Sequence, residues 1–361
     1  MRRRNLSLIA TATLSVAVAA CASPGAREPQ ASNPRPVVSH AAEPGERHLT
    51  NIRQLTFGGE NAEAYWSADG RRLTFQSTRD GRSCDQQFVM DADGGNLRRV
   101  SNGAGKTTCG YFFDRDRRIF FSSTHHADSA CPPRPDFSRG YVWRLDRFDI
   151  YTADANGQDL RRLTNWGAYT AEGTLSPDGS RIVFTSTKDG DLEIYTMRTD
   201  GSDVRRLTTT PGYDGGAFFS PDGAQIVYRA SHPADSAALA EYRSLLQQGL
   251  VRPSRMEIWI MNADGTNQRQ VTNLGGANFA PYFTPDGRRI IFASNHTNPR
   301  GRDFDLYLVA LDGSGLERVT THADFDSFPM FSPDGKRLVW ASNRHAAQQG
   351  ETNIFVADWR D

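Results

Sequence analysis

The side chains best suited to binding in this 361-residue sequence lie at two fixed distances before a repeated four-residue turn. The turn is typified by Ser176-Pro177-Asp178-Gly179. Six positions before the six copies of this turn the sequence has Asn61, Thr107, Thr170, Asp214, Asn278 and Asp326. Four positions before them it has Glu63, Cys109, Glu172, Gly216, Ala280 and Phe328.

Four of these residues are carboxylates, and a shared location would concentrate their charge. Alternate residues of a strand point to the same side, so both positions would face a channel lined by the strands that precede the turns. A carboxylate ring could hold a cation, a ligand amine or a Lys or Arg side chain of a partner. We therefore expect a ligand or partner to bind at a polar, acidic ring formed by Asn61, Glu63, Glu172, Asp214, Asn278 and Asp326.

No catalytic motif accompanies these carboxylates. The sequence lacks the Gly-x-Ser-x-Gly elbow of serine hydrolases and the His-Glu-x-x-His pair of zinc peptidases. Gly105-Lys106-Thr107 is not a Walker loop, because Val100 stands where the motif needs its first glycine. We expect no catalytic residue, no metal site and no cofactor. The alternative is an enzyme, or a receptor for a small ligand or divalent cation, that uses Glu172 or Asp326 and the other channel carboxylates.

Six copies of one unit position these residues. The five regular turns begin at Ser67, Ser176, Ser220, Thr284 and Ser332, and Phe113 begins a degenerate copy. Pro and Gly in the turn favour a reversal between antiparallel strands, and alternating apolar residues follow it, as in Ile182-Val183-Phe184. A third strand then leads through an Asp-Gly or Asn-Gly reversal into a fourth strand that ends in Leu-Thr or a close relative. Each unit therefore holds four short strands.

The last unit lacks its fourth strand, because the chain ends at Asp361 soon after Ile354-Phe355. The missing sequence stands at the other end, where Arg53-Gln54-Leu55-Thr56 has the pattern of a fourth strand without preceding strands. Pairing the two would close a ring and remove two exposed sheet edges. The predicted fold is an all-β, six-bladed β-propeller with four strands per blade, closed by an N-terminal strand that completes the last blade.

The strand order assigns every loop to one of two faces. The four-residue turns and the Asp-Gly reversals share the turn face, whereas the loops between blades and between second and third strands share the insert face. Two blades carry inserts on the insert face, and the first runs roughly from His125 to Arg144. Cys84, Cys109 and Cys131 fall on this face, and in an oxidising compartment two of them are expected to form a disulfide that pins the first insert. The sequence does not decide which two.

The second insert predicts a short helix. Asp235 or Ser236 can cap its start, and Gly249 can end it. One apolar stripe runs along it, made of Leu239, Tyr242, Leu245 and Leu246. The stripe is expected to pack on the propeller rim, and the alternative is a partner-binding edge.

The repeat resembles the propeller of the periplasmic TolB family. The resemblance rests on the Ser-Pro-Asp-Gly turn, the Ile-Tyr third strand, the Asp-Gly reversal and the Arg-x-Leu-Thr end, and it covers about residues 51–361. It implies a periplasmic propeller that binds the peptidoglycan-associated lipoprotein Pal or a similar envelope protein or peptide. TolB itself carries a separate α/β domain before its propeller, and this chain does not match that part.

The N-terminus resembles the export signal of bacterial lipoproteins. Arg2–Arg4 precede an apolar stretch, which ends in Val18-Ala19-Ala20-Cys21. We expect residues 1–20 to be the signal peptide, Cys21 to be acylated after cleavage, and residues 21–47 to form a Pro- and Ala-rich tether before a propeller at 48–361. Because Ala22 and not Asp follows the cysteine, the expected location is the periplasmic face of the outer membrane.

The charge balance excludes one large class of function. The chain has 42 basic and 42 acidic residues, so it offers no net positive charge for binding nucleic-acid phosphates. We expect no nucleic-acid partner, and contact with the membrane only through the lipid anchor.

Overall fold

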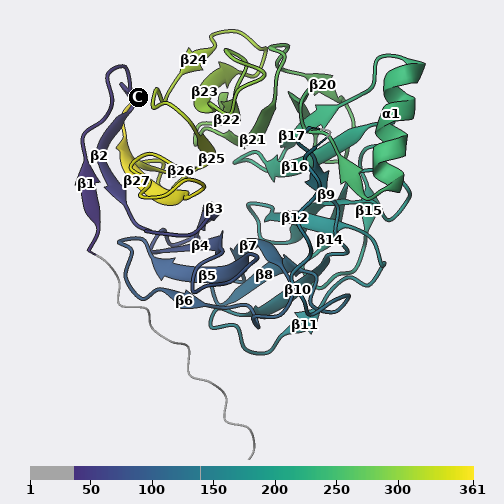
Figure 1. Cartoon of the computed structure of the whole chain (residues 1–361), viewed down its shortest axis with the longest axis horizontal. Coiled ribbons are helices and arrows are strands. Elements are labelled where there is room, and N and C mark those ends of the chain that lie inside the picture. Colours follow the sequence, from purple (N-terminus) through teal and green to yellow (C-terminus); the bar gives the residue numbers. More distant parts are fainter. Residues whose placement is uncertain (1–35, 139) are drawn as a thin grey trace, which may run out of the picture. The chain divides into compact units, whose positions relative to one another are not determined.

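The computed structural model describes residues 36–138 and 140–361, which form a ring of six antiparallel sheets (Figure 1). Each sheet is a blade whose first strand lies next to the centre and whose last strand lies at the rim. The predicted all-β, six-bladed fold is confirmed.

The blades follow one another along the chain. Blade 1 consists of β3 (Asn61–Trp66), β4 (Arg72–Ser77), β5 (Gln86–Asp91) and β6 (Arg98–Arg99). Blade 2 consists of β7 (Thr107–Phe113), β8 (Arg118–Ser123), β10 (Asp149–Asp154) and β11 (Arg161–Arg162). Blade 3 consists of β12 (Thr170–Leu175), β13 (Arg181–Ser186), β14 (Glu193–Arg198) and β15 (Arg205–Arg206).

The second half of the ring repeats this order. Blade 4 consists of β16 (Tyr213–Phe219), β17 (Gln225–Ser231), β19 (Glu257–Asn262) and β20 (Arg269–Gln270). Blade 5 consists of β21 (Asn278–Phe283), β22 (Arg289–Ser294), β23 (Asp305–Ala310) and β24 (Glu317–Arg318). Blade 6 consists of β25 (Asp326–Phe331), β26 (Arg337–Ser342) and β27 (Asn353–Trp359), followed outward by β2 (Leu49–Gln54) and β1 (Val38–His40). The inserts contribute β9 (Trp143–Arg144), α1 (Ser236–Gln247) and β18 (Leu250–Val251).

The residue types of the repeated turn follow from its hydrogen bonds. In blade 3 the Arg181 amide donates to Ser176 Oγ at 3.0 Å, and the Ser180 amide donates to the Asp178 carboxylate at 3.0 Å. Gly179 has a φ of +71°, in the left-handed region that favours glycine. Ser, Asp and Gly are therefore each required by the local backbone.

The residue two positions after the fourth strand closes each blade with its hydroxyl. In blade 3 the Ile194 amide donates to Thr208 Oγ1 at 2.9 Å, and the Leu207 amide donates to the Ile194 carbonyl at 2.8 Å. The hydroxyls in the same role elsewhere belong to Ser101, Thr164, Thr272, Thr320 and Thr56.

The N-terminal strand completes blade 6 as predicted. β2 pairs antiparallel with β27, with Arg53 opposite Val356 and Gln54 opposite Phe355. The closing bonds of the other blades recur here, since the Ile354 amide donates to Thr56 Oγ1 at 2.8 Å. Residues from the two ends of the chain thus form one sheet.

The folded part begins further toward the N-terminus than the sequence analysis expects. Residues 36–47 fall within the predicted tether, yet β1 pairs with β2 and places Val38 opposite Gln54. Glu46 is only 4% exposed. Composition alone did not reveal this, because backbone pairing and one buried carboxylate, rather than apolar side chains, hold the segment in place.

Apolar side chains fill the spaces between neighbouring blades. Trp66 of blade 1 is 2% exposed, and its indole N–H donates to the Met330 carbonyl of blade 6 at 3.2 Å. The Arg337 guanidinium lies over the same ring, 4.4 Å from its centroid. The junction between the last and first blades is therefore packed as a core.

Thr56→Val tests the closing hydroxyl. Thr56 is 2% exposed, and the change keeps its shape but leaves the Ile354 amide without an acceptor. We expect the free energy of unfolding to fall by about 2 kcal/mol, measured by urea denaturation. Thr50→Val is the control, because Thr50 Oγ1 is partly exposed and its bond to the Asp358 carbonyl is long at 3.3 Å. Equal losses in the two variants would contradict the assignment.

Candidate functional site

Each inner strand contains a β-bulge at the residue four positions before the turn. These residues have φ values between +52° and +60°, namely Glu63, Cys109, Glu172, Gly216, Ala280 and Phe328. The strand register shifts at the same place, as between Ala171 and Thr174 of β12. A bulge interrupts the alternation of side chains along a strand. The two positions that we predicted to line the channel together therefore point in different directions.

The residues six positions before the turn lie inside the blades and not in the channel. All six are 0% exposed: Asn61, Thr107, Thr170, Asp214, Asn278 and Asp326. Asn61 Nδ2 donates to the Thr352 carbonyl of blade 6 at 2.7 Å, and Asn278 Nδ2 donates to the Met256 carbonyl of blade 4 at 2.8 Å. Their prediction as channel-lining groups is wrong, because the bulge turns them into the blades.

A basic or imidazole side chain lies 18 residues after each of these positions, and the sequence analysis missed it. The six are Arg79, His125, Lys188, His232, His296 and Arg344. Each lies against an aromatic ring, for example His232 on Trp259 at 4.9 Å and Lys188 on Tyr195 at 4.8 Å between centres. The sequence does contain a pattern that predicts them, because most second strands end in Ser-x-Arg, Ser-x-Lys or Ser-x-His. Basic and imidazole groups therefore accompany the predicted acidic ring.

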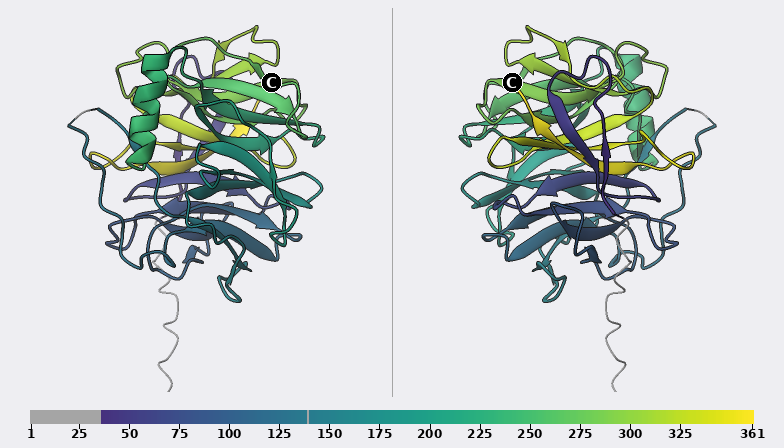
Figure 2. Two further views of the ribbon diagram at one scale, coloured as in Figure 1. Left: turned by 90° about the vertical axis from the view of Figure 1, so that its right-hand side faces the viewer. Right: turned by 90° about the vertical axis from the view of Figure 1, so that its left-hand side faces the viewer.

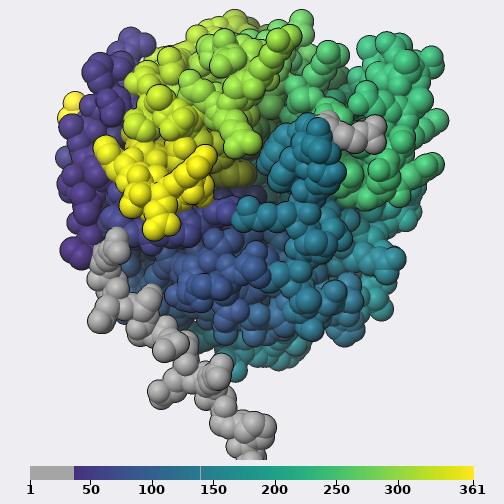
Figure 3. Space-filling model, in the orientation of Figure 1, coloured from purple at the N-terminus to yellow at the C-terminus, as the bar shows by residue number. Residues whose placement is uncertain are grey.

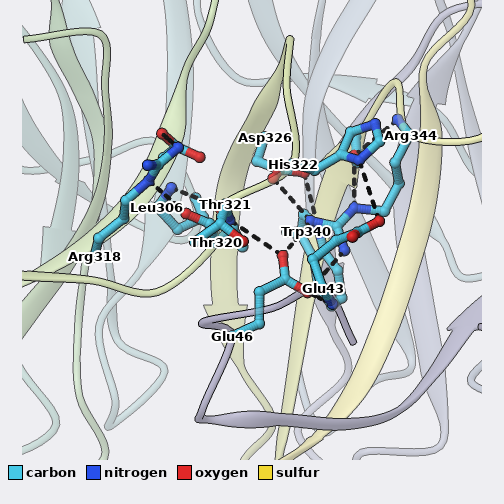
Figure 4. A network of polar contacts seen from close by, with 12 residues as sticks. Glu43, Glu46, Leu306, Arg318, Thr320, Thr321, His322, Asp326, Trp340 and Arg344 are labelled. Atoms are coloured by element: carbon cyan, nitrogen blue, oxygen red, sulfur yellow. Dashed lines mark hydrogen bonds and ion pairs between the residues drawn. The ribbon is translucent and has the colours of Figure 1, made fainter. Parts of the chain in front are cut away.

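Asp326 belongs to a buried ion-pair network rather than to an open rim (Figure 4). Arg344 Nη2 lies 2.9 Å from Asp326 Oδ2 and 2.8 Å from Glu46 Oε1, and none of the three side chains is more than 2% exposed. Glu46 Oε1 also accepts the amide of Thr321 in blade 5 at 3.2 Å. Asp214 is paired similarly with His232 at 2.9 Å.

The channel itself is almost filled. Its cavity of about 30 Å³ is lined by Glu63, Cys109, Glu172 and Arg229 among others, which is room for one or two water molecules. Aromatic rings block it further in, with Tyr65 5.7 Å from Phe218 and Phe218 5.2 Å from Tyr282 between centroids.

Glu172 is already neutralised by Arg229. The Arg229 guanidinium donates to Glu172 Oε1, and Glu172 Oε2 accepts the Gly216 amide at 2.9 Å and the Thr185 hydroxyl at 2.7 Å. A side chain at Gly216 would place Cβ 2.0 Å from Arg229 Nη1, so glycine is required for the guanidinium to reach Glu172.

Glu63 is the remaining carboxyl in the cavity. Burial raises its pKa to about 7, a hydrogen bond with Cys109 opposes the shift, and the negative charge of Glu172 adds to it. Burial also holds the pKa of the Cys109 thiol well above its usual range. The site thus combines a carboxyl with a raised pKa, a buried free thiol and a satisfied ion pair.

The four predicted carboxylates do not all meet in the cavity. Two of the four predicted carboxylates, Asp214 and Asp326, lie in buried pairs outside the cavity. Across residues 36–138 and 140–361, no group of three or more His, Cys, Asp or Glu side chains is placed to hold a metal ion.

The first insert forms an arch over the insert face. We use this name for residues 125–138 and 140–144. Its near end is joined to blade 1 by a disulfide between Cys84 and Cys131, which leaves Cys109 as a free, buried thiol. Arg134 adds an ion pair with Glu60 at 3.1 Å. The arch stands away from the blades on the side that carries α1 (Figure 2).

The far end of the arch joins the second insert. β9 pairs with β18, with Trp143 opposite Val251. Trp143 also lies 5.1 Å from the Arg229 guanidinium and 6.1 Å from the Tyr213 ring, beside the channel mouth. In the space-filling view the blue-green atoms of the first insert lie on the face turned to the viewer (Figure 3).

The predicted helix is confirmed as α1. Asp235 caps it by accepting the Ala238 amide at 2.8 Å, and Gly249 follows it with a φ of +68°. Its apolar stripe is half-buried, and Tyr242 and Leu246 pack with the arch on a small cluster over blades 3 and 4. The two inserts therefore share one hydrophobic core.

The crest of the arch exposes two aromatic side chains. Phe137 is 47% exposed and Tyr141 is 60% exposed, and their rings stack with centroids 5.6 Å apart. Within the described part of the chain, no helix is long and apolar enough to cross a membrane.

Glu63→Gln tests the raised pKa. The folded protein keeps the Glu63 proton up to about pH 7, whereas the unfolded chain releases it near its ordinary pKa of 4.5. The contribution of Glu63 to stability therefore falls as pH rises through this window and is constant above it. The variant cannot lose this contribution. We therefore expect the difference in Tm, variant minus parent, to increase between pH 5 and pH 8.

Glu60→Gln is the matched control, because the Glu60 side chain is 53% exposed. Its Tm difference from the parent should vary less over the same pH range, because the interactions of an exposed side chain are screened by solvent. A constant difference for Glu63→Gln as well would show that Glu63 is ionised throughout.

Known proteins show the same architecture. A family model described as the TolB beta propeller domain matches residues 134–248 and 250–361, which is more than half of the chain. The putative TolB from Agrobacterium tumefaciens has a TM-score of 0.57 at 20% identity, over 84% of this chain and 91% of that chain. TolB from Acinetobacter baumannii has a TM-score of 0.54 at 15% identity, over 80% of this chain and 64% of that one.

An enzyme has the same fold. A gluconolactonase from Xanthomonas campestris has a TM-score of 0.57 at 14% identity, over 92% of this chain and 99% of that chain. At such identities the similarity shows the fold alone, and the fold does not decide the function. No curated protein matches the chain.

Proposed function

Because this chain belongs to the TolB beta propeller domain family, we propose that it is a periplasmic propeller that binds a protein or peptide of the cell envelope through its insert face. One observation carries the proposal. Phe137 and Tyr141 stack on the crest of an arch that is fixed at both ends, by the Cys84–Cys131 disulfide and by the β9–β18 pair.

Such a crest has the properties of a protein-binding hot spot. Aromatic residues and Arg dominate the energetics of protein interfaces, and a surface that is already ordered loses little entropy on binding. The channel, by contrast, has room for one or two waters only. We therefore place the main contacts on the crest and the mouth of the channel, with a Pal-like envelope protein as the partner.

The six residues of the predicted acidic ring have two different roles in this proposal. Glu63 and Glu172 line the cavity beneath the proposed contact surface. The residues that hold the loops of the insert face in position are Asn61, Asp214, Asn278 and Asp326.

The location is part of the proposal and rests on the sequence. The predicted signal peptide of residues 1–20 and the predicted lipidation site, Cys21, lie outside the described residues. We propose that Cys21 anchors the chain in the outer membrane. Residues 22–35 then separate the anchor from the folded part, and fully extended they span at most about 50 Å. The propeller would thus stay close to the membrane.

Site-specific photo-crosslinking tests the proposed face. A photoreactive phenylalanine analogue is placed at Tyr141 and, as a control, at Leu316, which is 40% exposed and lies near a turn-face reversal. In living cells we expect one defined crosslinked protein from position 141 and none from position 316. Purified Pal from the same organism is then titrated against the parent and the Phe137→Ala/Tyr141→Ala variant.

A partner that crosslinks at position 141 and binds the double variant at least about tenfold more weakly than the parent would support the proposal. Crosslinking from position 316 alone, or equal binding by parent and variant, would contradict it.

A further inference from the structure

Acidic residues neutralise the arginines at the rim of blades 2 and 3. In blade 2, Asp159 Oδ2 lies 2.9 Å from Arg118 Nη1 and 3.0 Å from Arg161 Nη2, so one aspartate bridges two arginines. The next residue of the fourth strand, Arg162, pairs at 2.6 Å with Asp149, which begins the third strand. The residues that form the same pairs in blade 3 are Asp203, Arg181 and Arg205, and Glu193 with Arg206.

Blade 1 keeps the three arginines but lacks both acidic residues. Its arginines are Arg72, Arg98 and Arg99, and the strand register gives them the positions of those in blade 2. Asn96 stands in place of the bridging aspartate, and Gln86 begins the third strand. Among the described residues, none of the three arginines forms an ion pair with a carboxylate.

A fourth arginine, Arg82, joins them from the loop between β4 and β5. Its Nη1 donates to the Gly103 carbonyl at 3.2 Å. Arg99 lies against the same glycine, since a Cβ at Gly103 would be 2.8 Å from Arg99 Nη1. Burial lowers the pKa of Arg99, the charge of Arg82 lowers it further, and Asp80 opposes the shift. The two guanidinium groups therefore repel each other.

Arg72 and Arg98 form a second pair of like charges. A backbone carbonyl of blade 2 holds each guanidinium, at 2.7 Å for Arg72 and 3.2 Å for Arg98, and a carbonyl does not neutralise the charge. Burial lowers the pKa of Arg98, the charge of Arg72 adds to the shift, and Asp91 and Asp154 oppose it. Both carboxylates accept other bonds, Asp91 from the Asn96 side chain and Asp154 from amides of its own reversal.

We propose that these four residues, Arg72, Arg82, Arg98 and Arg99, bind the phosphate groups of an anionic membrane surface; we call them the arginine cluster. All four side chains are partly exposed, so an anion can reach them. Guanidinium groups bind phosphate through paired hydrogen bonds, and an anion between like charges removes their repulsion. The contact holds the rim of blade 1 on the membrane and leaves the insert face open to a partner.

The inference rests on the proposed lipid anchor, because the anchor brings the cluster to the membrane. Val37 packs in the reversal between β5 and β6, where a Cβ at Gly94 would lie 3.1 Å from Val37 Cγ2. Arg98 follows Gly94 closely in the same reversal. Residues 22–36 join Val37 to the proposed anchor at Cys21, and fully extended they span about 50 Å. Such a tether gives lipid phosphates a high effective concentration at the cluster.

Sedimentation with lipid vesicles tests the cluster without the anchor. The protein is produced from residue 22 onward, so it carries no acyl chain and keeps every described residue. Vesicles of phosphatidylcholine are compared with vesicles that also contain about 30% phosphatidylglycerol, at low ionic strength. We expect the parent to bind the anionic vesicles and not the neutral ones.

Two variants remove the free charge in different ways. Arg98→Gln/Arg99→Gln deletes two arginines, whereas Asn96→Asp keeps all four and restores the bridging aspartate. Asn96 has a φ of +50°, and Asp159 and Asp203 each have +52°, so the backbone accepts the change. We expect binding to anionic vesicles to weaken about tenfold in the double variant and about fivefold in Asn96→Asp. Asn96→Asp should also raise the Tm, because it relieves the repulsion.

Arg161→Gln/Arg205→Gln is the matched control. These arginines are 68% and 65% exposed and already paired, and the change removes the same net charge as the double variant. Vesicle binding should stay close to that of the parent. An equal loss in the control, or equal binding of the parent to both kinds of vesicle, would overturn the proposal. A Tm increase in inorganic phosphate without vesicle binding would overturn it too, because the cluster would then bind a soluble anion only.

Acylation of Cys21 is measured separately, by mass spectrometry of the N-terminal peptide of the protein from cells. Vesicle binding that depends on the cluster, in a protein without acylation, would contradict the proposed anchor and support the cluster. Acylation of Cys21 together with a parent that does not bind anionic vesicles would overturn the cluster and leave the proposed function intact.

Discussion

The ring depends on a buried arginine that joins the two ends of the chain. Arg344 follows β26 in the last blade, and its guanidinium is shared between Glu46, which precedes β2, and Asp326 at the start of β25. Three charges at 2% exposure or less are tolerated only when each is paired, because an unpaired buried charge is very costly. The pairing therefore holds the N-terminal segment against blade 6, next to the β2–β27 sheet.

The β-bulge in every inner strand then decides which side chains meet the channel. The left-handed residue at the bulge points to the centre, and the residue two positions earlier turns into the blade. Glu63 and Glu172 consequently border the cavity, whereas Asp214 and Asp326 are paired inside the fold. The channel therefore holds only a small cavity. The exposed aromatic side chains lie on the arch instead.

Local patterns predicted the parts of this structure that local hydrogen bonds determine. The hydroxyl of Thr56 completes blade 6 as Thr208 completes blade 3, so the repeat revealed the closure. The bulge left no such signal, because its six positions hold five different residue types and only Gly216 suggests a positive φ. The Glu46–Arg344 contact joins residues 298 positions apart, and the choice of Cys84 and Cys131 depends on how the arch folds back on blade 1. Neither follows from periodicity.

A double-mutant cycle between Glu46 and Arg344 tests the account most directly. Glu46→Gln, Arg344→Met and the combined variant are compared with the parent by urea denaturation. If the buried pair closes the ring, the two single variants will together lose more free energy of unfolding than the combined variant loses. We expect their summed loss to exceed the loss of the combined variant by about 2 kcal/mol, as for charges in contact. Additive losses, within about 0.5 kcal/mol, would show that the N-terminal segment is held without this pair and would contradict the account.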